Sequence, residues 1–331
     1  MPVFALPRLR YPKFEPKPRI LRVVKIVYLC YSFFVGVTIS AIQSQISDDV
    51  RWGLLQRKAQ ETFALRAFAL FRKQGIEPIL IKGLAAARYY PSNIPRISVD
   101  MDLAVAADDI EVAREVVASP EADGLAIDVH RELRHLDTVD WQDLYANSRL
   151  LKLEGGTIRV LRPEDHLRVL CVHWLTDGGS HKDRLWDICY TVENRPADFD
   201  WGRFLNVVSE RRRRWLVCTI GLAHKYLGLD VGDTPVKDAA IDIPTWLTKT
   251  VEREWENETP LRPLEACLNN PKLLARQIGM RLRPNPIFAT VDLEGSFDAR
   301  TRVFYQIGNF FRRIPSSYRR VSASLKRMTN E

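Results

Sequence analysis

Cysteine is scarce in this sequence, and the cysteines present lack the spacings that define a disulfide framework or a structural zinc site. There are five, they are scattered, and no Cys-x-x-Cys pair occurs among them. An odd number of widely separated cysteines argues against a small secreted disulfide fold, and no ligand spacing suits zinc. We therefore predict reduced, mostly buried cysteines in a cytoplasmic protein.

Three common motifs of nucleotide-binding and hydrolytic enzymes are also absent. The chain has no Walker A sequence, no Gly-x-Gly-x-x-Gly fingerprint and no Gly-x-Ser-x-Gly elbow. These absences argue against a P-loop NTPase, a dinucleotide-binding Rossmann domain and an α/β-hydrolase.

The chain has one long apolar run without a charged residue, Ile26 to Ile42, and seven Lys and Arg precede it between Arg8 and Lys25. The basic lead is too long for a signal peptide, and no small-x-small cleavage site follows. The run is also shorter than the ~20 residues that usually span a bilayer. A span would place the rest of the chain outside the cytoplasm, because the flanking positive charge is heavier on the amino-terminal side. We favour a buried or membrane-surface helix over a true span.

The chain has 331 residues and a net charge of +8. Its length allows a sizeable core and two domains, and its charge favours an anionic partner such as a nucleotide, a nucleic acid or a membrane surface. The stretch from Arg300 onward is strongly basic, which fits either a solvated tail or a contact with anionic lipid or RNA.

Hydrophobic periodicity changes along the chain. It predicts a long amphipathic helix over 48–73 with Gly75 as its C-cap, and then short alternating elements. Strands are expected at 78–82, 98–105 and 125–132, short helices at 84–90 and 108–118, and a hairpin turn at 154–157. After Pro163 the pattern becomes helical, over 164–176, 181–194, 200–212 and 214–227. We predict an α+β fold, with a small mixed-sheet core followed by a helical domain. The expected division of the chain is a basic and apolar N-terminal segment at 1–47, the mixed-sheet core at 48–162, the helical domain at 163–230, and a less regular helical region with a basic tail at 231–331.

Asp100 and Asp102 carry the clearest chemical signal, because they lie two apart on a predicted strand and so share one face. Adjacent carboxylates repel each other and are stable mainly beside cations. Mg²⁺ suits such a pair, and two ions can activate an attacking oxygen and stabilise a leaving pyrophosphate. A third carboxylate is expected on the next strand. Asp128 is the best candidate and Glu132 the alternative.

Basic residues precede this pair. Lys82-Gly83 follows an apolar strand and opens a short helix, where glycine allows a phosphate to approach the backbone. Arg96 lies four residues before Asp100, and its guanidinium suits a triphosphate oxygen. We predict that Lys82, Gly83 and Arg96 bind a nucleotide.

In this order the motifs resemble the polymerase-β-like nucleotidyltransferase superfamily, and within it the uncharacterised nucleotidyltransferase-5 family. The matching segments are Lys82-Gly83, Arg96 before Asp100-x-Asp102, Asp128-Val129-His130, Glu164-Asp165-His166-Leu167 with His173, and Leu185-Trp186-Asp187-Ile188. The resemblance covers roughly residues 48–230. It implies a nucleotidyltransferase core at 48–162, with NTP (ATP above all) and two Mg²⁺ ions bound by Asp100, Asp102 and Asp128. Nucleoside monophosphate would pass to an acceptor, either a small molecule, a peptide or RNA, with release of pyrophosphate.

One position departs from the superfamily pattern. Most active members have serine or glycine after the turn glycine, whereas this chain has Leu84. The departure keeps a second interpretation open, a catalytically silent nucleotide-binding or scaffold protein. A third interpretation, a membrane-surface or nucleic-acid-binding protein, rests on the basic termini.

The helical half contributes two histidines whose role, substrate binding or structural, the sequence leaves open. His166 and His173 lie seven apart and share a helix face, and Asp187 lies on the next helix. They fit either a substrate-binding face or, as we favour, a buried polar network. His130 shares the face of Asp128, where it would orient that carboxylate or contact substrate.

Overall fold

The computed structural model describes residues 48–98, 100–256, 264–267 and 270–314. The apolar run at 26–42 and the extreme basic tail lie outside them. Among the described helices, none is both long enough and apolar enough to cross a membrane. Four of the five cysteines fall within the described residues, and all four are buried as free thiols: Cys171, Cys189, Cys218 and Cys267.

The described part of the chain starts with helix α2 (Asp48–Lys73), whose bounds agree with the predicted range. Its buried residues Ala64, Ala67, Phe68 and Phe71 recur at helical spacing and form its core face. The helix stops at Gly75, which has a φ of 74° that glycine adopts without strain. The N–H of Ile76 then donates to the carbonyl of Phe71, which satisfies a terminal acceptor.

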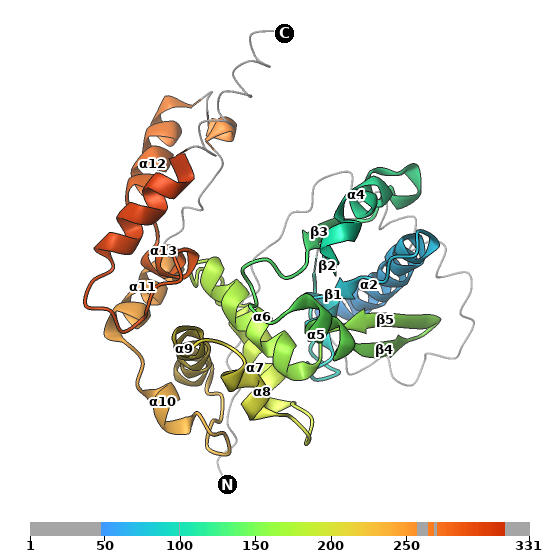
Figure 1. Cartoon of the computed structure of the whole chain (residues 1–331), viewed down its shortest axis with the longest axis horizontal. Coiled ribbons are helices and arrows are strands. Elements are labelled where there is room, and N and C mark those ends of the chain that lie inside the picture. Colours follow the sequence, from blue (N-terminus) through green and yellow to red (C-terminus); the bar gives the residue numbers. More distant parts are fainter. Residues whose placement is uncertain (1–47, 99, 257–263, 268–269, 315–331) are drawn as a thin grey trace. The chain divides into compact units, whose positions relative to one another are not determined.

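A mixed five-stranded sheet follows, with the order β3-β2-β1-β5-β4 (Figure 1). Its strands are β1 (Ile79–Leu80), β2 (Met101–Val105), β3 (Ile127–Arg131), β4 (Arg149–Leu153) and β5 (Gly156–Val160). β2 runs antiparallel to β1 but parallel to β3, and β4 and β5 form the predicted hairpin. The helices between the strands are α3 (Leu84–Ala87), η1 (Ala107–Asp109), α4 (Ile110–Ala118), η2 (Pro120–Ala122) and α5 (Trp141–Ala146).

The two faces of the sheet pack into different hydrophobic cores. Leu80, Leu103 and Val105 face α2 and α4, whereas the intervening Ile79 and Ala104 join the core of the helical half. Side chains alternate along a strand, so Asp102 lies on the same face as Ala104. The sheet thus directs Asp102 toward the helices that follow it in the sequence.

Those helices are α6 (Pro163–Thr176), α7 (Leu185–Glu193), α8 (Trp201–Asn206) and α9 (Glu210–Leu227). Pro163 starts α6, and most of that helix is buried. The predicted single helix over 200–212 is wrong: the chain turns at Val207–Ser209 and begins α9. The Asp200 side chain caps α8, and the Ser209 side chain caps α9 by accepting from Arg212 N–H.

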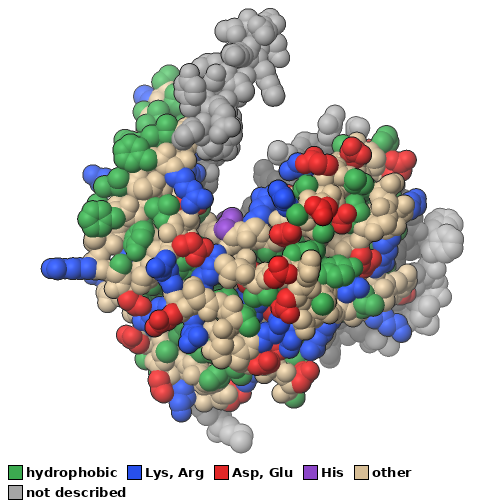
Figure 2. Space-filling view, in the orientation of Figure 1, with side chains coloured by type: hydrophobic (Ala, Val, Ile, Leu, Met, Phe, Trp, Pro, Cys, Tyr) green, Lys and Arg blue, Asp and Glu red, His purple; other side chains and the backbone are tan. Residues whose placement is uncertain are grey.

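The remaining described elements are helical, in agreement with the predicted α+β fold. They are α10 (Lys237–Ile241), α11 (Thr245–Glu256), η3 (Glu265–Cys267), α12 (Pro271–Leu282), α13 (Pro286–Asp292) and a last helix over 303–314. The indole of Trp255 and the side chain of Asn285 donate to the carbonyls of Gly179 and Gly178, which ties α11 and the start of α13 to the turn after α6. Hydrophobic side chains gather on the exposed surface over α12 and 303–314 (Figure 2).

Candidate metal and nucleotide site

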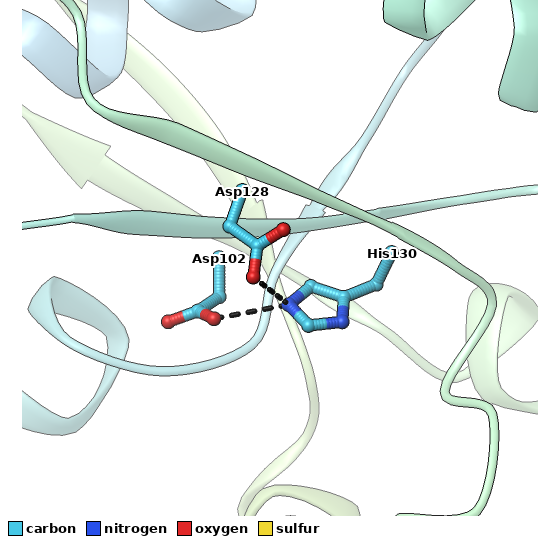
Figure 3. Close-up of side chains that lie close together, drawn as sticks. All are labelled: Asp102, Asp128 and His130. Atoms are coloured by element: carbon cyan, nitrogen blue, oxygen red, sulfur yellow. Dashed lines mark hydrogen bonds and ion pairs between the residues drawn. The ribbon is translucent and has the colours of Figure 1, made fainter. Parts of the chain in front are cut away.

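Strand register brings Asp102 and Asp128 together. The two residues are direct neighbours across the parallel pair β2 and β3, and His130 lies one side-chain repeat further along β3. Figure 3 shows the three side chains converging from these strands. One ligand atom from each of the three lies within 4.8 Å of the others. The sequence-based expectation that Asp128 shares the face of the β2 carboxylate therefore agrees with the strand register.

The spacing of these atoms fits a divalent cation. His130 Nε2 lies 3.0 Å from Asp102 Oδ1 and 3.4 Å from Asp128 Oδ2. Neighbouring ligands of an octahedral ion with bonds of about 2.1 Å are roughly 3 Å apart. Asp102 is buried and Asp128 exposed, so the cluster reaches from the interior to the surface. Two carboxylates and an imidazole form a donor set that divalent metals accept.

Asp100 lies outside this cluster. β2 begins at Met101, whose N–H donates to the Ala126 carbonyl, so Asp100 precedes the strand and is exposed. Within the described part of the chain, no ion pair or hydrogen bond to the Asp100 carboxylate occurs. Glu132, the alternative third carboxylate, follows β3 with a φ of 52° and is exposed.

Lys82 joins the site from the turn after β1. Its Nζ lies 2.7 Å from Asp102 Oδ1 and 2.9 Å from His173 Nε2 on α6. Burial alone would raise the pKa of Asp102, but the hydrogen bond from His130 and the charge of Lys82 outweigh it and lower the pKa to about 2. Asp102 is therefore a carboxylate at any physiological pH.

His173 is a neutral acceptor for Lys82. Burial and the neighbouring Lys82 charge lower the pKa of His173 to about 4. Its other ring nitrogen, Nδ1, lies 3.6 Å from Asp177, which also pairs with Arg184. Asp177 was not among the predicted site residues. The four-residue spacing between His173 on α6 and Asp177, the C-cap of that helix, is the signal that would have found it.

Arg96 has a different partner from the one predicted for it. Its Nε and Nη2 donate to the two carboxylate oxygens of Asp187, at 3.1 and 2.8 Å, and Nη1 donates to the Ile97 carbonyl. Tyr90 donates to the same carboxylate at 2.7 Å. This largely buried pair joins the loop before β2 to α7. The structure thus brings Arg96 and Asp187 together and leaves the guanidinium occupied.

Gly83 is required by the backbone. Its φ of 61° and ψ of −114° form a conformation that other residues avoid. A Cβ there would lie 2.8 Å from Ser98 Oγ, so the absence of a side chain lets this turn pack against the segment entering β2. Leu84, the departure from the superfamily pattern, is buried with α2 and the sheet in the core on that side.

Two acidic residues of the Glu164-Asp165-His166 motif hold the helical half together. Glu164 accepts from Asp200 N–H, and Asp165 binds Arg168 and Arg203 in a buried ion-pair network. His166 is fully buried, and burial beside a cationic guanidinium lowers its pKa well below the usual value. Its Nδ1 lies 3.4 Å from Arg88 Nη2 and its ring stacks on that of Tyr89, so His166 contacts the segment after α3 and not the Asp165 network, and its structural role stays a prediction.

Comparison with known families fits this arrangement. Residues 114–228 match the family described as uncharacterised nucleotidyltransferase. This nucleotidyltransferase match confirms the resemblance stated from the motifs, and it contains Asp128, His130, His173 and Asp187. It begins after Asp102, so the Lys82-Gly83 turn and β2 lie outside the matched residues. Comparison with curated proteins and with solved structures gives no match. Residues 114–228 are therefore similar to that nucleotidyltransferase family, and the structure places beside them an acidic cluster that suits a metal ion.

Proposed function

We propose that the protein is a divalent-metal-dependent enzyme that transfers a nucleoside monophosphate from an NTP to an acceptor and releases pyrophosphate. The observation that carries this proposal is the convergence of Asp102, Asp128 and His130 across the register of β2 and β3. The family match over 114–228 supports the reaction class. Mg²⁺ and ATP are the ion and nucleotide expected from the sequence.

Each residue has a distinct task in this proposal. Asp102 and Asp128 bind the cation with carboxylate oxygens, and His130 is placed to bind it through Nε2. When bound, such an ion neutralises phosphate charge and lowers the pKa of an attacking oxygen. Asp100, exposed at the entrance to β2, is available for a second ion in the two-metal form of the reaction.

Phosphate binding falls to Lys82, since Arg96 is occupied by Asp187. We assign Arg96 a positioning role, in which its ion pair holds the segment before β2 against α7. Gly83 lets that segment approach the turn that carries Lys82. Asp128 is exposed enough to accept a proton from an acceptor hydroxyl or amine, whether the acceptor is a small molecule, a peptide or RNA.

A transfer assay tests the proposal. Purified protein is incubated with each NTP, Mg²⁺ or Mn²⁺ and a cell extract, and pyrophosphate release and nucleotide adducts are measured by mass spectrometry. We expect an adduct that disappears with Asp102→Asn and persists with Asp123→Asn, a control at an exposed residue outside the cluster. Equal adduct yield from both variants would reject the proposal.

The burial of Leu84 favours one second candidate, a nucleotide-binding protein without transfer activity, because no side-chain hydroxyl follows Gly83. NTP binding that depends on Lys82, with no pyrophosphate released by any acceptor fraction, would support it. The interpretation that rests on the basic termini falls mostly on residues outside the described ranges and stays a prediction.

A further inference from the structure

Lys82 has two partners that a simple phosphate-binding lysine would not need. Its ammonium lies against Asp102 Oδ1 and His173 Nε2, and its side chain is only 14% exposed. Asp102 Oδ1 is also the oxygen that His130 approaches to 3.0 Å. One carboxylate oxygen therefore faces both the lysine and the ligand nitrogen of the proposed metal site.

Binding of Lys82 and of a metal ion to Asp102 Oδ1 at the same time is electrostatically unfavourable. An ion bonded to Asp102 would be about 2 Å from the carboxylate, and so within about 5 Å of an ammonium that stayed in place. Like charges at that separation repel strongly in a largely buried site. The triphosphate of an NTP offers the ammonium other anionic oxygens, and a lysine pairs with phosphate as a point charge.

His173 limits where the ammonium can go. It accepts from Lys82 through Nε2, it is neutral, and it lies on α6, across from the strand that carries Asp102. A lysine that leaves Asp102 can keep this contact and remain at the site.

We propose that Lys82 couples metal binding to triphosphate binding. In the metal-free protein Lys82 neutralises Asp102. An incoming triphosphate takes the ammonium, which frees Asp102 for the cation, so the nucleotide and the ion each favour the binding of the other. This inference rests on the proposed function, because it requires Asp102 to be a metal ligand.

Direct metal binding tests the coupling without any turnover. Free Mn²⁺ is measured by electron paramagnetic resonance in titrations of wild type, Lys82→Met, Lys82→Gln and Lys82→Arg. Lys58→Met is the matched control, because it removes the same charge from an exposed ion pair on α2. Circular dichroism and urea unfolding confirm that each variant folds.

We expect Lys82→Met and Lys82→Gln to bind Mn²⁺ alone at least about tenfold tighter than wild type, because the competing charge is gone. Lys82→Arg and Lys58→Met should bind it like wild type. In EDTA, ATP affinity measured by calorimetry should fall in Lys82→Met and Lys82→Gln and be unchanged in Lys58→Met.

Two other results are possible, and they differ in what they overturn. Equal Mn²⁺ affinity in wild type and both neutral Lys82 variants, with binding lost in Asp102→Asn, overturns the coupling and leaves the metal site standing. Absence of Mn²⁺ binding in all of these proteins, with Lys82→Met included, overturns the coupling and the proposed function together.

Discussion

Asp102 and Asp128 face each other across the parallel strands β2 and β3, one buried and one exposed, and His130 lies within 3.4 Å of both carboxylates. Such a pair needs positive charge to be stable. Lys82, at 2.7 Å from Asp102, supplies such a charge. The site therefore contains both a set of metal ligands and a positively charged side chain, Lys82, that competes for one of them.

The first prediction separates the two aspartates of the Asp-x-Asp motif. Because Asp102 lies in the cluster and Asp100 precedes the strand, Asp102→Asn should abolish Mn²⁺ binding. Asp100→Asn should retain one bound ion and lose any second one. Equilibrium dialysis with metal analysis gives the stoichiometry. Loss of all metal from Asp100→Asn, with retention in Asp102→Asn, would reverse the assignment.

The second prediction concerns the Gly83 turn. Gly83→Ala should destabilise the protein, since its φ and ψ do not suit alanine and the new Cβ meets Ser98. Gly124→Ala is the matched control: φ is also positive, at 80°, but a Cβ there meets nothing within 4 Å. The free energy of unfolding should fall by about 1 kcal/mol in the control Gly124→Ala and by at least about twice that in Gly83→Ala.

Urea denaturation measures the loss of unfolding free energy in both variants. Adding Ser98→Gly to Gly83→Ala should restore part of the stability that Gly83→Ala loses. Equal losses at Gly83 and Gly124 would mean that the contact with Ser98 carries no cost.

The third prediction distinguishes a positioning role from a binding role for Arg96. Arg96→Met leaves Asp187 largely buried without its guanidinium, which should cost about 3 kcal/mol of unfolding free energy. Arg114→Met, which breaks an exposed pair with Glu111, should cost less than about 0.5 kcal/mol. ATP affinity of folded Arg96→Met, measured by calorimetry, should stay within about twofold of wild type. A large loss of ATP affinity at unchanged stability would instead favour direct nucleotide binding.

The fourth prediction follows from the pKa of His173, which is about 4 in the folded protein against an ordinary 6.5. The unfolded chain binds the proton more tightly, so protonation favours unfolding. This contribution is negligible above pH 6.5, grows as the pH falls toward 4 and is constant below it. As the pH falls from 6.5 to 4, the free energy of unfolding of the wild type should decrease by up to about 3 kcal/mol more than that of His173→Gln.

Urea unfolding of both proteins between pH 7 and pH 4 gives this difference directly, because the other titrating groups are common to both. Parallel stability curves would show that His173 is not held neutral by the fold.

Much of the fold could be predicted because it depends on local patterns. The apolar periodicity over 48–73 predicts the bounds of α2, and the alternation around Asp128 predicts the face of β3 that Asp128 shares with Asp102. The break between α8 and α9 was missed, although Ser209 is a good N-cap, because the helical pattern of 200–212 continues through it.

The contacts that define the site could not be predicted in the same way. Lys82 meets His173, and Arg96 meets Asp187, in each case 91 residues later in the chain. Such pairs depend on how α6 and α7 pack against the sheet, which no local pattern specifies. The two-residue spacing of Asp100 and Asp102 suggested one shared face, but β2 starts at Met101, so Asp100 lies before the strand.

The most direct measurement is a crystal structure of the protein soaked with Mn²⁺ and ATP, with anomalous diffraction recorded at the manganese edge. We expect a manganese peak about 2 Å from carboxylate oxygens of Asp102 and Asp128 and from His130 Nε2, with Lys82 displaced toward the phosphates. A manganese peak elsewhere, with Lys82 still bound to Asp102, would contradict it.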